Sequence, residues 1–441
     1  MTIQLDETHR ADLSCWVESA ARTDTDFPIQ NLPLGCFRTA KRAARPGVAI
    51  GDEIFDLAAA RKASLLSAAT TELVTLCTDE RALNPLLAAG HDALMRLRGE
   101  LSRLLRTDTP EGERARRARA QLLVPIADAE LLLPAHVGDY TDFYASVHHA
   151  TNVGSMFRPD NALLPNYKYV PIGYHGRASS IVASGSIVRR PHGQTRDEGA
   201  TAPTFGPTRR LDYELEVGAV IGRGNALGTS IPLAEAEMHV AGLCLVNDWS
   251  ARDIQAWEYQ PLGPFLAKNF STTMSPWIVT LAALAPFRAP ALTRPGGDPP
   301  PLPYLLDADN ERSGGLAITL EVLLSSARMR AERHEPMRVS IGSFTDMYWT
   351  VAQLVTHHTS NGCNLQSGDL LASGTVSGAT PDSRGCLLER TWRGTEPLTL
   401  PTGETRRFLE DGDEVVMRGW CERDGYRRIG FGDCRGVVAG T

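Results

Sequence analysis

Hydrophobic and polar residues in the first third of the chain predict a small strand-containing unit followed by helices. Apolar runs at residues 48–50 and 54–57 flank Gly51-Asp52, which is typical of a β-hairpin with a tight turn. Leucines then recur at three- and four-residue spacing between residues 94 and 105, which predicts a helix with one apolar face. Residues 1–25 are polar, and we expect them to form a frayed tail.

Beyond residue 132 the pattern changes to short apolar runs separated by turn residues, as in a strand-rich domain. The predicted strands span residues 179–188, 211–221, 241–247, 277–279, 317–324, 369–373, 414–420 and 428–431. The proline-rich residues 285–303 predict a structured loop. We therefore expect two domains, residues 1–132 and residues 133–441.

Composition and charge narrow the choice of function. The 39 glycines and 28 prolines among 441 residues favour many tight turns over a helical bundle. The net charge of −7 argues against a nucleic-acid partner. An arginine cluster at residues 114–119 has helical spacing beside glutamates, which favours a solvated helix face over a polyanion-binding patch.

The eight cysteines form no C-x-x-C pair, so neither a zinc ribbon nor a thioredoxin-like motif is expected. The chain starts without a signal-peptide pattern, and none of its apolar runs approaches the roughly 20 residues that a membrane span requires. We therefore expect free thiols, a cytoplasmic location and no membrane partner.

The strongest chemical signal is the sequence LDYELEVG at residues 211–218. Side chains alternate along a strand, so Asp212, Glu214 and Glu216 would share one face, with neighbouring carboxylates about 7 Å apart. Next to a buried run these carboxylates would repel, and Mg²⁺ or Ca²⁺ would relieve that repulsion. The alternative is a half-exposed strand with a solvated acidic face, and this segment alone does not decide between the two.

A second signal is the apolar run that ends at Asn247-Asp248. Polar groups at the end of a rigid strand are favoured positions for sites. A helical turn after Asp248 would place Arg252, Gln255 and Tyr259 on one side. The alternative for Asp248 is a helix N-cap, and both readings remain open.

Other candidate residues stand in three further segments. Aromatic and acidic residues at 139–144 precede His148 and His149, and histidine suits proton transfer near neutral pH, although a single histidine is more often structural. Lys268 lies in an apolar segment and needs an acidic or oxyanion partner. Glu389 ends an apolar run and also needs a partner. The glycine-flanked residues 373–378 fit a phosphate or carboxylate cradle.

Together these segments resemble the fumarylacetoacetase (fumarylacetoacetate hydrolase) family. The matching stretches include DFPIQNLPLG (26–35), GDYTDFYAS (138–146), HATNVGSMFR (149–158), IGYHGRASS (172–180), LDYELEVG (211–218), NDWSARDIQAWEYQPLGPFLAKNFSTTMSPW (247–277), HHTSNGCNL (357–365), GDLLASGTVSG (368–378) and DGDEV (411–415). Arg390 departs from the family pattern, which has an apolar residue there; we expect an alternating strand to point Arg390 away from Glu389.

The resemblance implies a mainly β fold with minor helix. A small N-terminal SH3-like β-barrel domain would precede a catalytic domain of the β-roll or β-sandwich type, and the chain would form a homodimer. The implied cofactor is a divalent cation, Mg²⁺ or Ca²⁺, and the sequence does not choose between them.

The resemblance also assigns roles to residues. The metal site falls on Asp142, Glu214, Glu216 and Asp248, with Lys268 and Thr272 beside them. The catalytic residues fall on His149, its orienting acid Glu389, and the oxyanion-stabilising Arg252, Gln255 and Lys268. Substrate contacts fall on Tyr144, Arg158, Tyr174, Gln255, Tyr259 and Thr375.

The implied reaction is metal-dependent hydrolysis of the carbon–carbon bond of 4-fumarylacetoacetate to fumarate and acetoacetate, the last step of tyrosine and phenylalanine degradation. The substrate would be a small dicarboxylate diketone. One alternative is an acylpyruvate hydrolase or another 2-oxoacid enzyme of the same fold. Another is a non-catalytic binding module, which we would expect to have lost His149, Glu389 or Lys268.

Overall fold

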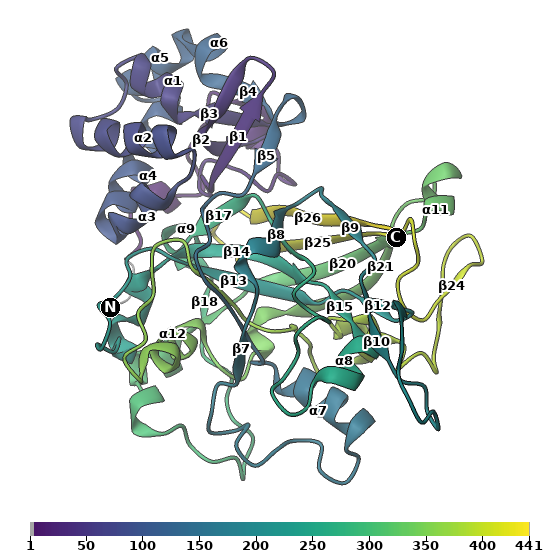
Figure 1. Cartoon of the computed structure of the whole chain (residues 1–441). Coiled ribbons are helices and arrows are strands. Elements are labelled where there is room, and N and C mark those ends of the chain that lie inside the picture. The colour runs from purple at the N-terminus through teal and green to yellow at the C-terminus, as the bar shows by residue number, and fades with distance from the viewer. Residues whose placement is uncertain (1–3, 441) are drawn as a thin grey trace.

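The computed structural model describes residues 4–440 of the chain, and it is mainly β with a minor share of helix, as expected (Figure 1). The N-terminal part contains β1 (Leu34–Thr39), β2 (Arg42–Ile50), β3 (Glu53–Asp56), α1 (Leu57–Lys62), α2 (Ala68–Glu80), α3 (Asn84–Ala88), α4 (His91–Leu105), α5 (Pro110–Arg117), α6 (Arg119–Leu122), β4 (Leu123–Pro125) and β5 (Glu130–Leu132).

The rest of the chain carries the other strands and helices. The strands are β6 (Tyr140–Phe143), β7 (Gly173–His175), β8 (Ile181–Ala183), β9 (Ile187–Arg189), β10 (His192–Thr195), β11 (Thr204–Pro207), β12 (Leu211–Asp212), β13 (Leu215–Ile221), β14 (Val240–Asp248), β15 (Ser250–Ala251), β16 (Thr272–Met274), β17 (Trp277–Thr280), β18 (Arg288–Ala289), β19 (Gly315–Leu316), β20 (Thr319–Ser325), β21 (Met337–Ser343), β22 (Leu370–Ala372), β23 (Leu398–Thr399), β24 (Thr405–Arg406), β25 (Glu414–Cys421) and β26 (Ile429–Ala439). The helices are α7 (Val147–Phe157), α8 (Arg252–Glu258), α9 (Leu281–Leu284), α10 (Ala308–Ser313), α11 (Ala327–Ala331), α12 (Val351–Thr359) and α13 (Leu387–Arg390).

The two elements with the clearest sequence patterns form as expected. Strands β2 and β3 make the predicted hairpin, with Ile50 opposite Glu53 and Gly51 at φ +56° in the turn. Helix α4 buries its leucine stripe in a core that the N-terminal part shares with the large sheet. The arginines of α5 are exposed, and Arg117 pairs with Glu113, which fits a solvated helix face.

The expectation of a frayed N-terminal tail is wrong for residues 4–25. Thr8 and His9 are buried, and His9 Nε2 lies 2.8 Å from the carbonyl oxygen of Ala282. The buried Arg98 guanidinium donates to Thr8 Oγ1 at 2.8 Å and to the backbone oxygens of Gln30 and Asn31. A buried guanidinium needs such acceptors, and this requirement orders the polar segment.

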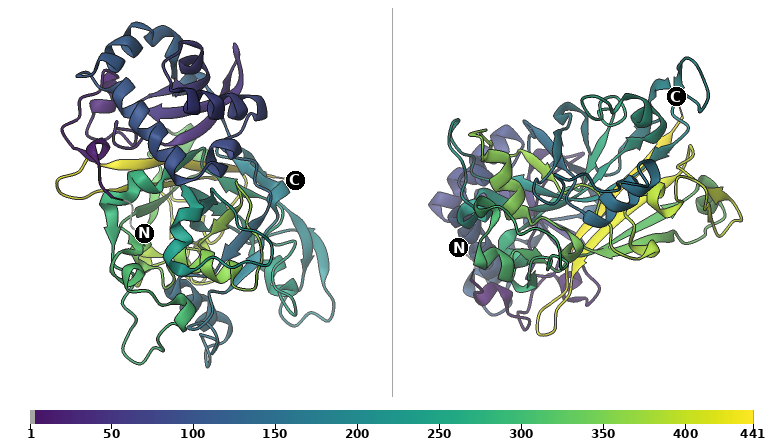
Figure 2. Two further views of the ribbon diagram at one scale, coloured as in Figure 1. Left: turned by 90° about the vertical axis from the view of Figure 1, so that its left-hand side faces the viewer. Right: turned by 90° about the horizontal axis from the view of Figure 1, so that it is seen from below.

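The largest sheet runs through both parts of the chain. Its main path is β4-β3-β2-β1-β17-β14-β13-β22-β6-β7, so β1 of the N-terminal part pairs directly with β17. A second sheet, β21-β20-β25-β26-β9, packs against the first through contacts of β25 and β26 with β14. The part of the chain after residue 132 is therefore a sandwich, and the yellow C-terminal segment that includes β26 lies next to the purple N-terminal part (Figure 2). The division at residues 132 and 133 stays a prediction.

Two predicted strands are broken in the structure. Residues 179–188 form β8 and β9, which join different sheets and are separated by a turn with Gly185 at φ +93°. Residues 211–221 form β12 and β13 with a break at Tyr213 and Glu214, because β12 pairs with β15 and β13 pairs with β14. The break puts Asp212 and Glu214 in different surroundings.

Candidate metal and catalytic centre

Four carboxylates converge where the central strands of the large sheet end. Asp142 lies on β6, Glu214 at the bend before β13, Glu216 on β13 and Asp248 at the end of β14. One oxygen atom from each lies within 4.8 Å of the others, and all four side chains are buried. Asp212, which the alternating pattern places with them, lies outside this acidic cluster because of the strand break.

The solvated-face reading of the acidic segment is wrong, because Glu214 is only 5% exposed and Glu216 is fully buried. Among residues 4–440, neither carboxylate oxygen of Glu216 nor Oδ1 of Asp142 has a hydrogen-bond partner. Burial and the neighbouring carboxylates raise the pKa of Asp142 and of Glu216 well above the ordinary range. Unpaired buried oxygen atoms in a group of four acids fit a hard divalent cation.

Lys268 and Thr272 lie beside this acidic cluster. The Lys268 ammonium donates to Glu214 and, at 2.7 Å, to Asp248 Oδ2, while Thr272 Oγ1 donates to Asp248 Oδ1 at 2.8 Å. An ammonium has no lone pair, so Lys268 acts as a charge partner of the acids and not as a metal ligand. Burial raises the pKa of Glu214, but Lys268 and Arg252 outweigh it and lower this pKa to about 2.

Asp248 is the last residue of β14 and is not a helix N-cap, because α8 is preceded by Ala251. Its Oδ2 also accepts a hydrogen bond from Tyr174 at 2.7 Å. Helix α8 holds Arg252 and Gln255 on one side, as their spacing predicted, and Arg252 Nη1 donates to Gln255 Oε1 at 3.2 Å.

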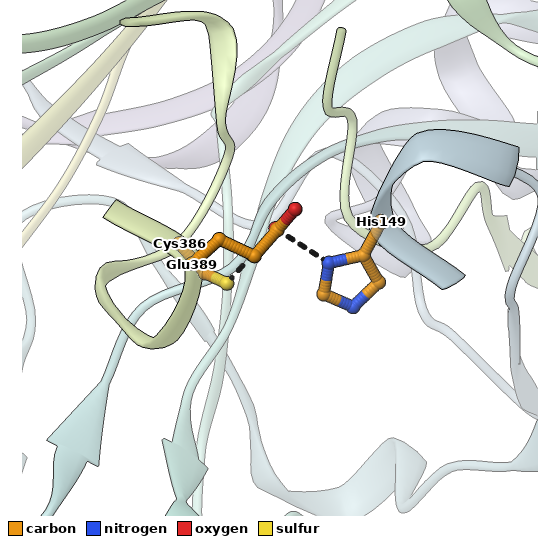
Figure 3. Close-up of side chains that lie close together, drawn as sticks. All are labelled: His149, Cys386 and Glu389. Carbon is orange, nitrogen blue, oxygen red and sulfur yellow. Dashed lines mark hydrogen bonds and ion pairs between the residues drawn. The ribbon is translucent and has the colours of Figure 1, made fainter. Parts of the chain in front are cut away.

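A buried histidine–glutamate pair forms a second group of titratable side chains. Helix α7 carries His149, and its Nδ1 lies 2.6 Å from Oε2 of Glu389 in α13 (Figure 3). Burial raises the pKa of Glu389, but His149 and the surrounding side-chain hydrogen bonds outweigh it and lower this pKa to about 2. Glu389 is therefore a carboxylate that can fix the tautomer of His149.

Three further donors to Glu389 were not found from the sequence. Asn152 Nδ2 donates to Oε1 at 2.8 Å, and Ser377 Oγ and Cys386 Sγ donate to Oε2 at 2.8 and 3.2 Å. The position of Asn152, three residues after His149 on a helix, is a signal that could have identified it. Cys386 also lies three residues from Glu389, whereas Ser377 has no local signal, because the path of the chain brings it there.

Arg390 points away from Glu389, but for a different reason from the one expected. The segment is a single helical turn and not a strand, and Arg390 donates to the carbonyl oxygen of Pro381 at 2.6 Å. The departure from the family pattern therefore leaves the surroundings of Glu389 intact.

A cavity of roughly 420 Å³ reaches the acidic cluster through Asp142 and Glu214, which line it. All six predicted substrate-contact residues line it, namely Tyr144, Arg158, Tyr174, Gln255, Tyr259 and Thr375. His149, Arg252 and Lys268 also line it, whereas Glu389 lies behind His149. Leu262 and Pro264 contribute to the rim and were not among the predicted residues.

Known proteins are similar to this chain in sequence and in fold. The chain matches two family models, "Fumarylacetoacetate (FAA) hydrolase C-terminal" over residues 139–439 and "Fumarylacetoacetase N-terminal" over residues 30–134. The chain belongs to the fumarylacetoacetate hydrolase family. Members of this family hold a divalent metal, and the acidic cluster is the group of residues that could bind it here.

Curated relatives cover nearly the whole chain. The fumarylacetoacetase of Arabidopsis thaliana is 49% identical over 418 residues, and those of Rattus norvegicus and Homo sapiens are 47% and 46% identical; each match covers 94% of this chain and 96% of the relative. A fumarylacetoacetate hydrolase structure from Exiguobacterium antarcticum aligns with a TM-score of 0.50 at 17% identity, covering 93% of this chain and 100% of that one. That structural likeness concerns the fold alone.

Proposed function

We propose that this chain hydrolyses the carbon–carbon bond of 4-fumarylacetoacetate to give fumarate and acetoacetate. The family and the curated fumarylacetoacetases at 46–49% identity support this substrate. The observation that carries the proposal is that His149, Lys268 and two acids of the cluster, Asp142 and Glu214, line one cavity. A general base and a cation site at one cavity suit the attack of water on a diketone.

His149 is the proposed general base. Glu389 accepts from Nδ1, which leaves Nε2 to take a proton from water as the water oxygen bonds to the carbonyl carbon. The carbon–carbon bond then breaks, and the leaving carbon, which carries the electron pair as an enolate, takes up a proton. A positioned base of this kind contributes about 10²–10⁴-fold to the rate.

Charged donors would stabilise the oxygen atoms that become negative. Arg252 and Lys268 line the cavity with Gln255, and each well-placed donor is worth about 3 kcal/mol in such a step. Asp142, Glu214, Glu216 and Asp248 would hold the cation. A bound Mg²⁺ or Ca²⁺ would supply Lewis-acid charge at the diketone oxygens.

The remaining lining residues suit a substrate with a carboxylate at each end. Arg158 supplies a cation, and Tyr144, Tyr174 and Tyr259 supply hydroxyl groups at the cavity. Thr375 is buried, and its hydroxyl has no partner in the described part of the chain, so it can hydrogen-bond to a bound molecule. The glycine before it, Gly374, has φ +77° and lets this turn press against β6.

The substrate is tested by comparing turnover of fumarylacetoacetate with that of acylpyruvates and of oxaloacetate under the same metal conditions. We expect fumarate and acetoacetate in equal amounts, and kcat/KM highest for fumarylacetoacetate. Equal or better turnover of an acylpyruvate would favour the alternative reaction of this fold.

The base is tested with His149→Ala, for which we expect a loss of about 10²–10⁴-fold in kcat with cation binding retained. His148→Ala is the matched control, because His148 does not line the cavity and should keep its activity. Unchanged turnover of His149→Ala would contradict the assignment, and a wild-type chain without any turnover would favour a binding module.

We also propose a homodimer in the cytoplasm, as the family resemblance and the sequence imply. All eight cysteines are free thiols, as a reducing compartment would leave them. Within residues 4–440, no helix is long and apolar enough to cross a membrane. Sedimentation of the metal-loaded protein tests the dimer, and titration calorimetry with Mg²⁺ and with Ca²⁺ tests which ion binds more tightly.

A further inference from the structure

Asp212 is a buried carboxylate to which the proposed reaction gives no role. It lies two residues before Glu214 but outside the acidic cluster, and its side chain is fully buried. Oδ2 accepts from Arg252 Nε at 2.9 Å and from the backbone N–H of Leu388 at 2.9 Å. Oδ1 accepts from the backbone N–H groups of Leu387 at 2.8 Å and Tyr213 at 2.9 Å.

The backbone partners of Asp212 begin the short helix that carries Glu389. Leu387 and Leu388 are the first two residues of α13, and the first N–H groups of a helix need acceptors from outside it. Cys386, the residue before the helix, makes no capping hydrogen bond with its side chain. Asp212 supplies these acceptors from a distant part of the chain and so fixes the turn that presents Glu389 to His149.

The side-chain partner of Asp212 is Arg252, which also contacts the acidic cluster. Arg252 donates through Nε to Asp212, while its Nη1 lies 2.7 Å from Glu214 Oε1. Two carboxylates on one planar guanidinium fix its orientation. The third nitrogen, Nη2, is buried and has no hydrogen-bond partner in the described part of the chain, and Arg252 is one of the residues that line the cavity.

We propose that Asp212 is a positioning residue that joins the oxyanion donor Arg252 to the turn bearing Glu389. One carboxylate thereby sets the distance between the group that stabilises negative charge and the pair that activates water. The inference rests on the proposed function, because it assigns Asp212 to the same reaction through residues that face the substrate.

The competing view is that Asp212 only stabilises the fold, and Asp56 provides a matched control for it. Asp56 is also fully buried, caps the start of α1 through Ala59 N–H at 2.9 Å and pairs with Arg42 at 2.7 Å. It belongs to the N-terminal hairpin and does not line the cavity. Both residues thus combine a buried ion pair with a helix cap, but only Asp212 touches the site.

The experiment measures kcat, KM and thermal unfolding for Asp212→Asn and Asp56→Asn in the metal-loaded protein. We expect kcat of Asp212→Asn to fall by about 10²-fold, as a displacement of about 1 Å produces, with KM changed by little. Asp56→Asn should lose thermal stability while its kcat stays close to wild type. Near-wild-type kcat in Asp212→Asn would overturn the proposal.

Double-mutant cycles then separate positioning from a general loss of structure. If Asp212 acts through Arg252 and Glu389, Asp212→Asn should cost much less in the Arg252→Ala background and in the Glu389→Gln background than in wild type. Additive losses in both cycles would overturn the inference.

A second variant covers the case in which Asp212→Asn does not fold. Asp212→Glu keeps the charge but displaces the carboxylate by one methylene, so its kcat should fall with KM retained. Failure of both variants to fold would assign Asp212 to stability and overturn the positioning role. A wild-type chain that is inert toward fumarylacetoacetate would contradict the proposed function alone, and the cycles would then be run on the substrate that it does turn over.

Discussion

At the scale of single residues, hydrogen-bond donors decide how a buried carboxylate behaves. Glu389 accepts from four side chains, and its pKa is lowered to about 2 despite burial. Glu216 is equally buried, but neither of its carboxylate oxygens has a hydrogen-bond partner among residues 4–440, and burial among other acids raises its pKa well above the ordinary range. The first arrangement is complete in the protein alone, whereas the second could hold a cation.

Glu216→Gln tests this difference through metal removal. Without metal, we expect the variant to unfold at a higher temperature than wild type, because the amide replaces a carboxyl group whose pKa is raised on folding by burial and by the neighbouring acids, which destabilises the folded wild type. Adding Mg²⁺ or Ca²⁺ at about 100 times its Kd should stabilise wild type by about 2.7 kcal/mol and the variant by much less. Asp413→Asn is the control, since Asp413 is buried but paired with Arg406, and its metal response should persist. An equal metal response in Glu216→Gln would contradict the assignment.

Glu389 also predicts how stability depends on pH. Its pKa is about 2 in the folded chain and has an ordinary value of 4.5, so the unfolded chain binds the proton more tightly. The stabilisation is present above about pH 4.5 and is lost as the pH falls toward 2. In urea unfolding between pH 5 and 2.5, the stability difference between wild type and Glu389→Gln should therefore shrink as the pH falls. A constant difference would show that the carboxylate charge is not involved.

At the scale of elements, a helix or a hairpin forms as its own sequence predicts where the periodicity is regular or the turn residues are clear. The leucine spacing of α4 and the Gly51 turn between β2 and β3 specify their structures locally. Where a segment divides between two sheets, as residues 179–188 do, the turn at Gly185 marks the break, but only the pairing partners decide that β8 and β9 join different sheets. The break before β13 has the same cause, and it separates Asp212 from the acidic cluster.

The leucine stripe of α4 makes a prediction about stability. Leu101 is 1% exposed, and Leu101→Ala should lower the free energy of unfolding by about 2–5 kcal/mol, because it leaves a cavity in the core. Leu76→Ala on α2 is the control; its side chain is 45% exposed, and the change should be within about 0.5 kcal/mol. Thermal and denaturant unfolding measure both, and kcat of each variant should remain close to wild type. A Leu101→Ala protein as stable as wild type would be inconsistent with this packing.

At the scale of the whole molecule, the N-terminal part is built into the catalytic sheet. Leu34 and Gly35 of β1 stand opposite Ile278 and Trp277 of β17, and one apolar core includes residues from both parts. Asn31 Nδ2 donates to the carbonyl oxygen of Gly430 at 2.7 Å, so the segment before β1 is also held against β26. The two parts should therefore unfold together.

Gly35 tests this junction. A Cβ atom at Gly35 would lie 2.5 Å from the Trp277 ring and 2.7 Å from the carbonyl oxygen of Pro276. Gly35→Ala should therefore cost about 1–3 kcal/mol through overpacking, in a single calorimetric transition that moves to lower temperature. Gly206→Ala is the control, because nothing lies within 4 Å of its added Cβ. Two separate transitions in wild type would argue against a shared core.

The sequence by itself determined the mainly β class, the hairpin, the α4 stripe, and the residue types needed for a cation and a proton transfer. Its motifs also indicated the family, and the resemblance to that family implied the site residues. This was possible because functional side chains in this chain lie in short contiguous segments such as LDYELEVG. Tertiary structure alone decided which of these side chains meet. Asp212 and Glu214 are two residues apart and both contact Arg252, but Asp212 lies outside the acidic cluster, while Ser377 and Asn152 come from separate segments to the carboxylate of Glu389. Periodicity reports which face is buried, whereas the partners of a buried charge depend on strand breaks and on contacts between residues far apart in the sequence.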